Sequence, residues 1–341
     1  MLIETTTIKT IAEATGLSLT TVSRVLNGVS KKYRISTATE AKILEQADLL
    51  GYIPNQAARN LRLKKSFAIG LVIPNLGNPF FANVVSVINQ VLHERGYSVI
   101  LTDCNEDEKL EIEAVNALSG RNIDGMIVIP SGRGKKHLKL LQQKGIPIVF
   151  IDRYFDDIAI PYVATNHYEG ALKITTYLIE KGHSRIACLQ GTHHVMPNVR
   201  RVKGYQDAME KHQLVPFYIG GNGFTFKSGY LETKLLMQRS EKPTAILALS
   251  DTILLGCLKS LTEDGFNVPD DISIATFDNS VYLDFLACPV TSVAQPVSDI
   301  ATIAIKLLLE KMDKDIASSD GQEKILISPP IIHRSSIKAS T

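Results

Sequence analysis

The chain has 341 residues, of which 45% are apolar and 21% are charged, and its formal net charge is +2. These values exclude a disordered or collagen-like chain, and the length allows two or three globular domains. The charge is uneven, because residues 1–65 carry ten Lys or Arg against five Asp or Glu, whereas residues 66–341 carry 27 against 30. A basic N-terminal segment on a slightly acidic remainder predicts a module that binds a polyanion, although a solvated charged surface would give the same balance.

No apolar run is long enough to span a membrane, and the N-terminus lacks the basic start and apolar core of a secretion signal. The cysteines lie far apart without paired spacing, which predicts buried thiols in a reducing compartment: Cys104, Cys188, Cys257 and Cys288. We therefore expect a cytoplasmic protein that contacts no membrane and holds no metal or cofactor.

The first predicted elements are two short helices within residues 7–28, joined by a tight turn as in a helix-turn-helix. Thr7 and Ser18 are expected to cap the two helices, and Gly16 provides the backbone freedom that the turn requires. An ordinary amphipathic helical hairpin is the alternative interpretation of this pattern.

The second helix directs Val22, Val25 and Leu26 inward and leaves a polar face. Arg can bind guanine through two hydrogen bonds, Asn can bind adenine, Thr can bind phosphate or a base, and an apolar tip can contact a thymine methyl. A third helix over about 36–50 would brace the pair, and the loop before it offers basic side chains to phosphates or simply to solvent. The residues of this region that we predict to contact DNA are Thr7, Ser18, Leu19, Thr20, Thr21, Ser23, Arg24, Asn27 and Arg34.

Residues 54–61 contain good helix formers but extend over only about two turns. A helix that short is marginal in water, so we expect it to form only when something stabilises it. A plain basic linker is the competing interpretation.

From Phe67 onward, short apolar runs alternate with amphipathic helical stretches. Such runs predict strands buried on both faces of parallel sheets with crossover helices, and the pattern occurs twice. The predicted strands lie within residues 67–74, 97–103, 125–130, 146–152, 185–191, 245–251 and 272–278. The predicted fold is therefore an all-α N-terminal head followed by an α/β body of two doubly wound parallel-sheet subdomains.

Ligands of such sheets bind at the carboxyl ends of the strands, where this sequence is polar. Residues 75–81 follow the first strand, Asp152 and Arg153 follow the fourth, and Asp278 follows the seventh. Planar donors and acceptors beside aromatic rings suit a sugar, whose hydroxyls need fixed hydrogen bonds. An Asp at a strand end can instead simply cap the next helix.

The motifs TVSRVLNG (residues 21–28) and GYIPNQAARNLR (residues 51–62) resemble those of the LacI family of bacterial transcriptional regulators, and the resemblance covers nearly the whole chain. It implies a head over residues 1–53, a hinge helix and linker over 54–65, and an effector-binding and dimerisation domain over 66–341. The hinge helix would order on operator DNA, with a leucine wedged into the minor groove. The hinge residues that the resemblance assigns to DNA are Asn55, Ala58, Leu61 and Arg62.

The body is similar to the periplasmic sugar-binding fold, and to ribose-binding proteins in particular. The resemblance implies a first subdomain over about 66–162 and 292–323 and a second over about 163–291 and 324–341. Ser250 departs from the pattern, because those proteins have Asn at its position, and this puts ribose itself in doubt. The effector-binding residues implied are Asn78, Phe80, Phe81, Asp152, Arg153, Arg201, Phe224, Ser250, Asp251, Asp278 and Gln295.

We expect a homodimer that binds a pseudo-palindromic operator as a repressor of carbohydrate genes, with a monosaccharide or derivative as effector. Closure of the two subdomains on the effector would alter the spacing of the two hinges and so the affinity for DNA. A phosphoprotein or purine corepressor remains an alternative. The tail after Ile332 lacks apolar heptads, so we expect no C-terminal coiled coil.

An enzyme built on the doubly wound body is the alternative from another class. Residues 131–136, SGRGKK, lack the spacing of a phosphate-binding loop, and His193 and His194 are adjacent, so they cannot share one face of an element as metal ligands. No nucleophile motif accompanies them. We therefore expect no catalytic activity.

Overall fold

The computed structural model describes residues 6–52, 65–313 and 323–340. The chain divides into two compact units, Met1–Ser66 and Phe67–Thr341, called the head and the body below. The predicted hinge residues Asn55, Ala58, Leu61 and Arg62 lie outside the described residues.

The head is a bundle of short helices: α1 Ile8–Thr15, α2 Leu19–Leu26, the 3-10 turn η1 Lys31–Tyr33, and α3 Thr37–Leu49. Its small core consists of Ile11, Ala12, Val22, Val25, Ile43 and Ala47, all of them buried. The turn between α1 and α2 needs Gly16, whose φ of 67° lies in the left-handed region. The helix-turn-helix prediction is confirmed.

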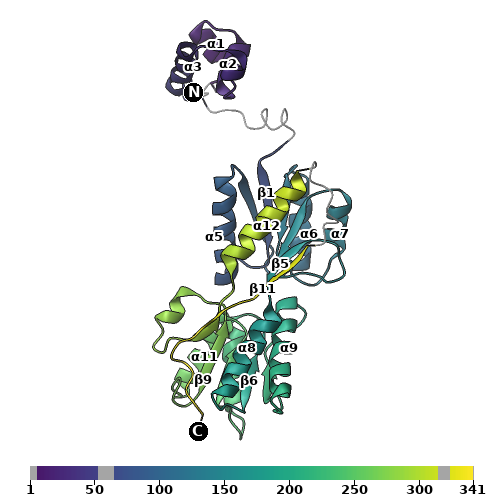
Figure 1. Cartoon of the computed structure of the whole chain (residues 1–341), viewed down its shortest axis with the longest axis vertical. Helices are drawn as coiled ribbons and strands as arrows, with labels where there is room; N and C mark the ends of the chain where they lie inside the picture. Colours follow the sequence, from purple (N-terminus) through teal and green to yellow (C-terminus); the bar gives the residue numbers. More distant parts are fainter. Residues whose placement is uncertain (1–5, 53–64, 314–322, 341) are drawn as a thin grey trace. The chain divides into compact units, whose positions relative to one another are not determined.

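The body contains two six-stranded sheets, and most of their strands are followed by a helix (Figure 1). The first sheet has the order β11-β5-β4-β3-β1-β2, and all of its neighbouring pairs are parallel. Its strands are β1 Ala68–Ile73, β2 Ser98–Asp103, β3 Gly125–Val128, β4 Ile148–Ile151, β5 Tyr162–Thr165 and β11 Lys324–Ile327. Its helices are α5 Pro79–Glu94, α6 Glu108–Ser119, α7 Lys136–Gln143 and α12 Val297–Met312.

The second sheet has the order β12-β10-β9-β8-β6-β7, and β12 is antiparallel to β10. Its strands are β6 Ile186–Leu189, β7 Tyr218–Gly220, β8 Ala245–Ala248, β9 Ser273–Phe277, β10 Thr291–Val293 and β12 Ile331–Ile332. Its helices are α8 His167–Glu180, α9 Met196–Lys211, α10 Phe226–Met237 and α11 Asp251–Glu263, and the 3-10 turn η2 Val281–Asp284 follows β9.

Each sheet is covered by helices on both faces, which explains why its central strands are continuous apolar runs. In the first sheet, alternate side chains of β1 and β4 pack against α5 and α12 or against α6 and α7. In the second sheet, α10 and α11 cover one face, and α8 and α9 cover the other. The expectation that every strand is buried on both faces is wrong for β2, which lies at a sheet edge and has only exposed and half-buried residues.

The predicted subdomain boundaries near 162, 291 and 324 each fall two to four residues too early. β5 and β11 pair with each other in the first sheet, so residues 163–165 and 324–327 do not belong to the second subdomain. β10 likewise pairs in the second sheet. The first half of the body is therefore drawn from residues 67–165, 297–313 and 323–327, and the second half from 166–293 and 328–340. The boundaries were misplaced because these short strands were interpreted as the segments in which the chain crosses between the two subdomains.

In both sheets the first strand of the half lies between the second and third, in the order 2-1-3-4-5, so the direction of winding reverses beside β1 and beside β6. Loops after adjacent strands diverge at such a reversal and leave room for a ligand at the carboxyl ends. By this rule we expect a binding crevice near the loops after β1 and β3 in the first half, and after β6 and β8 in the second.

Helices α10 and α11 approach each other closely at Gly256. A Cβ atom at this position would lie 2.0 Å from the Phe226 carbonyl oxygen and 2.6 Å from the Tyr230 amide nitrogen, both in the α10 backbone. Such an atom could be accommodated only by moving the two helices apart.

We expect Gly256→Ala to lower the free energy of unfolding by about 1–3 kcal/mol, because overpacking of that size forces backbone shifts. Urea unfolding of the full chain measures the change. Gly120→Ala is the matched control, since Gly120 has a φ of −69° and its nearest new contacts would be at 3.6 Å. The control should be neutral or stabilise by about 0.4–1 kcal/mol, and equal effects of the two substitutions would contradict the packing argument.

Candidate functional site

The head presents the exposed face of α2, which begins with a capped first turn. The Ser18 hydroxyl accepts a hydrogen bond from the Thr21 amide at 3.1 Å, and the Thr7 hydroxyl caps α1 in the same way through Thr10. Val22 and Val25 are buried against α1 and α3, so the opposite side of α2 is left to solvent. Leu19, the first residue of α2, is 52% exposed on this side.

A hollow of about 660 Å³ lies along this face of α2. Arg24 is held within it, with the centre of its guanidinium group 3.8 Å from the centroid of the Tyr33 ring. This cation–π contact restricts the arginine before any ligand arrives. The residues that line the hollow are Ile8, Leu19, Thr20, Ser23, Arg24, Val29, Lys32 and Tyr33.

Five of the nine DNA contacts predicted in the head do not line this hollow: Thr7, Ser18, Thr21, Asn27 and Arg34. Asn27 directs its amide nitrogen to the Ser23 carbonyl oxygen at 2.5 Å, so this side chain closes the C-terminus of α2. Arg34 is exposed at the end of η1, where its φ is 52°. Sequence reasoning missed Tyr33, although its position between basic residues was a usable signal.

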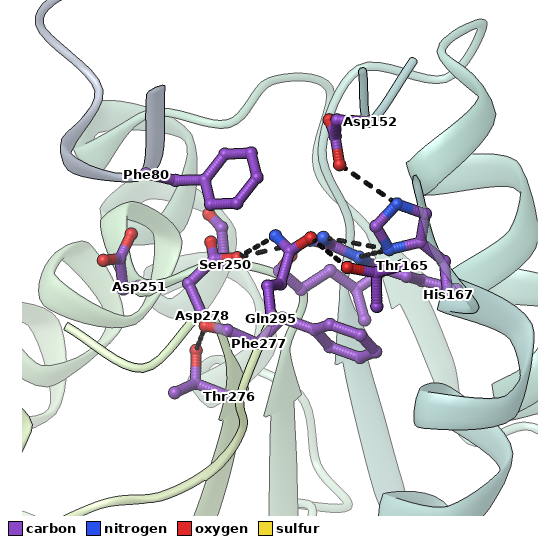
Figure 2. Close-up of polar contacts among 12 residues, drawn as sticks. Phe80, Asp152, Thr165, His167, Ser250, Asp251, Thr276, Phe277, Asp278 and Gln295 are labelled. Carbon is purple, nitrogen blue, oxygen red and sulfur yellow. Dashed lines mark hydrogen bonds and ion pairs between the residues drawn. The ribbon is translucent and has the colours of Figure 1, made fainter. Parts of the chain in front are cut away.

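The body brings ten of the eleven predicted effector residues around one cavity. They come from the carboxyl ends of strands in both halves and from the start of α5 and α9. The lining consists of Asn78, Phe80, Phe81, Asp152, Arg153, Pro197, Arg201, Phe224, Ser250, Asp278 and Gln295. Asp251 is the exception, because its carboxylate accepts a hydrogen bond from Ser280, and Figure 2 shows it turned away from the others.

The cavity has a volume of about 20 Å³, which is room for roughly one water molecule. A second hollow of about 570 Å³ adjoins it, because Phe80, Asp278 and Gln295 line both. Ligand pockets usually have roughly 300 Å³ or more, so a sugar could enter the smaller cavity only if side chains or the two halves moved.

Backbone geometry directs the key side chains inward. Asn78 caps α5, with its side-chain oxygen accepting from the Phe80 amide at 2.9 Å. Asp152 and Asp278 follow β4 and β9 with φ values of 62° and 67°, in a region that Asp tolerates better than most residues. This backbone conformation interrupts the extended strand and places each aspartate in the lining of the cavity.

A hydrogen-bonded chain runs from Asp152 through His167 to Arg201. The His167 Nε2 lies 3.1 Å from the Asp152 Oδ1 (Figure 2). The Arg201 Nε lies 3.3 Å from the His167 Nδ1. Arginine can only donate, so Nδ1 accepts and the imidazole carries its proton on Nε2. The Arg201 Nη1 also donates to the Leu249 carbonyl at 2.5 Å, and the guanidinium stacks 4.2 Å from the Phe277 ring centroid.

A second chain runs through Gln295, whose amide donates to the Asp278 Oδ1 at 2.5 Å and whose carbonyl accepts from Thr165 at 2.7 Å. Thr165 belongs to the first half and Asp278 to the second. Figure 2 shows Gln295 lying between them. Both chains therefore join the halves across the cavity.

The pKa values of the two aspartates shift in opposite directions, although burial raises both. Burial alone raises the pKa of Asp152, but the hydrogen bond from His167 and the charges of Arg201 and Arg153 outweigh it and hold the pKa below its ordinary value. Burial raises the pKa of Asp278 to about 7, because Arg201 offsets only part of the cost and Asp251 adds repulsion. Burial and the charge of Arg201 lower the pKa of His167, which keeps the imidazole neutral.

Sequence reasoning missed three residues of this region: His167, Thr165 and Glu106. His167 and Thr165 lie at the carboxyl end of β5, so the rule that directs attention to strand ends would have found them had β5 been predicted. Glu106 follows β2 and binds Arg153. Its position shortly after a predicted strand was the feature of the sequence that could have identified it.

The cysteines line neither the hollow of the head nor the cavity of the body. Cys104, Cys188 and Cys257 are buried as expected, but Cys288 is only half-buried. The described ranges contain no group of three His, Cys, Asp or Glu side chains arranged to hold a metal ion. None of the helices in the described parts of the chain has the length and apolar character needed to cross a membrane.

Two family models match the chain. The model described as bacterial regulatory proteins, lacI family, matches residues 7–55, and a periplasmic binding protein-like domain matches residues 175–337. Catabolite control protein A of Priestia megaterium is 32% identical over 92% of this chain and 94% of its own length. The ribose operon repressor of Halalkalibacterium halodurans is 33% identical over 91% of each chain. A structure of the lac repressor has the same fold, with a TM-score of 0.89 at 24% identity over 98% of this chain and 100% of its own.

We expect the wild type to lose stability relative to Asp278→Asn as the pH rises from about 4 to about 7. The folded chain holds a proton on Asp278 up to about pH 7, whereas the unfolded chain releases it near pH 4, so ionisation opposes folding across this window. Asn fits the left-handed backbone and can still accept from Gln295. Urea unfolding of both chains at several pH values tests this, and parallel curves would show that burial does not raise the pKa of Asp278.

Proposed function

Because the chain belongs to the lacI family of bacterial regulatory proteins and is a DNA-binding transcriptional regulator, we propose that it represses genes of carbohydrate use. Its affinity for the operator is set by a monosaccharide, or a close derivative, bound in the body cavity. The observation that carries the effector proposal is the convergence of Asn78, Asp152, Arg201, Asp278 and Gln295 beside aromatic rings. Fixed planar donors and acceptors match the hydroxyls of a sugar, and the rings match its C–H faces.

The head supports sequence-specific binding through α2. Its exposed face combines an arginine, threonines and an apolar tip, which are the side chains that read base edges in a major groove. One such helix contacts few bases, so we propose a homodimer on a pseudo-palindromic operator. We place its action in the cytoplasm, where a bacterial regulator meets DNA. The relative from Halalkalibacterium halodurans is a ribose operon repressor, which favours a binding protein over an enzyme on the same fold.

Control by the effector follows from its contacts with both halves. Asp152 and Arg153 belong to the first half, whereas Arg201 and Asp278 belong to the second. A ligand that binds all four stabilises one relative position of the halves over others, and it shifts their equilibrium by the difference in affinity. We propose that this shift alters the dimer and so the separation of its two heads on DNA.

Arg24→Ala should weaken binding to the operator by roughly 10–100-fold, the cost of about 1–3 kcal/mol that accompanies loss of a base contact, and should weaken binding to random DNA much less. Fluorescence anisotropy with both DNAs measures the ratio. Lys32→Ala is the control within the same hollow, because a phosphate contact should affect both DNAs equally. An equal loss for Arg24→Ala would assign that arginine to the phosphate backbone.

The effector is tested by thermal unfolding of the full chain with pentoses, hexoses, sugar acids, sugar phosphates and purines. A ligand at a hundred times its Kd should stabilise the body by about 2.7 kcal/mol. Asp152→Ala should abolish the shift, whereas Asp270→Ala should keep it, because Asp270 is exposed and pairs only with Lys338 among the described residues. If no sugar shifts the midpoint and a purine does, the carbohydrate proposal fails. If nothing shifts it, a protein corepressor is the remaining candidate.

A further inference from the structure

The charge of Arg153 in the body cavity is already matched by a carboxylate of the chain itself. Its Nη1 and Nη2 donate to the two carboxylate oxygens of Glu106, both at 2.7 Å. The Arg153 side chain is 3% exposed and that of Glu106 is 35% exposed, so the pair lies at the wall of the cavity with its acidic member toward the outside. A parallel pair of this kind fixes the guanidinium plane as well as balancing its charge.

The backbone around Glu106 is shaped to hold this pair. Asn105 and Glu106 have φ values of 46° and 58°, two consecutive left-handed residues without a glycine. Such positions persist only where the surroundings enforce them. Here the Glu106 amide donates to the Pro74 carbonyl at 2.6 Å, and the Asn105 amide donates to the Asp103 carboxylate at 2.9 Å. The turn is thereby tied to the loop after β1, which carries Asn78.

Arg201, the other cation of the lining, is also balanced. Its Nη2 lies 3.8 Å from the Asp278 Oδ1, and its Nε reaches Asp152 through the neutral His167. Outside the lining, Arg200 pairs with Asp156 at 3.1 Å, and Arg133 is exposed to water, which screens its charge. The cavity therefore has no surplus of positive charge: Asp152 and, behind Arg153, Glu106 balance the two arginines, and Asp278 adds negative charge when it is ionised.

We propose that the cavity takes an uncharged polyhydroxylated ligand and discriminates against its phosphorylated or carboxylated analogues, and that Glu106 is the residue that sets this preference by neutralising Arg153. This proposal rests on the proposed function, because it narrows the sugar class of the same site. Glu106 does not line the cavity and acts through Arg153, so it is a positioning residue.

The physical reason is the cost of burying a negative charge. An anionic ligand would have to displace Glu106 from Arg153 or lie among Asp152, Asp278 and Glu106 without a cation of its own. An unpaired buried charge costs several kcal/mol, whereas sugar hydroxyls can use the donors and acceptors that the ion pairs leave available. Burial leaves Asp278 partly protonated at neutral pH, so it can both donate to and accept from a hydroxyl.

The experiment is titration calorimetry of the full-length protein with matched pairs: ribose with ribose 5-phosphate, and glucose with glucose 6-phosphate and gluconate. The wild type should bind at least one neutral sugar at least tenfold more tightly than its anionic partners. Tighter binding of a phosphate or acid than of its parent sugar would overturn this proposal and leave the sugar effector intact. Failure of every sugar, neutral or charged, would instead overturn the proposed effector class and this inference with it.

Glu106→Gln removes the charge and keeps the shape, so it should raise the affinity for the anionic member of the bound pair at least tenfold relative to the neutral one. Glu106→Asp keeps the charge and should retain the wild-type preference. Glu113→Gln is the matched control, because Glu113 is an exposed residue of α6 and its substitution removes the same charge from the same half. Thermal unfolding midpoints confirm that each variant is folded. An unchanged ratio in Glu106→Gln, or an equal change in Glu113→Gln, would show that Glu106 does not set the preference.

Discussion

The hydrogen-bonded chain from Asp152 through His167 to Arg201 is the interaction on which the rest of the body depends. All three side chains are buried, and together they cross from the first half to the second. Arg201 can only donate, which fixes the proton of His167 on Nε2 and directs it to Asp152. Loss of any one member would leave a buried polar or charged group without its partner. This costs more stability than replacing both partners of a pair by apolar groups would.

The same arrangement makes the cavity suitable for regulation. The groups that a sugar would bind are the groups that now bind one another across the two halves, through His167 on one side and Gln295 on the other. A ligand must replace these contacts with its own hydroxyls, so its binding is coupled to the relative position of the halves. Glu106 lies one step further out and controls which charges the ligand can carry.

Most of the candidate site could be predicted from the sequence, because it depends on a local rule. Polar residues that follow buried apolar runs meet at the carboxyl ends of parallel strands, and Asp152 and Asp278 were found in this way. His167 was missed because β5 is only four residues long and was read as a crossing between subdomains. The pairing of β11 with β5, which corrects the boundary, joins residues 162 positions apart and has no local signature.

The sequence by itself determined the helix-turn-helix, the two doubly wound sheets and the family, because caps, turns and apolar periodicity are local properties of the chain. Only the tertiary structure decided which carboxylate serves which arginine. Glu106 and Arg153 are 47 residues apart, and the left-handed turn after β2 and the order of the strands bring them together. Asp251 shows the reverse, since it follows β8 as a site residue should, yet its carboxylate is bound by Ser280. The net charge of the cavity depends on which of these side chains pair with one another. Pairing requires that two groups be close in space, and the spacing of residues along the chain does not specify that distance.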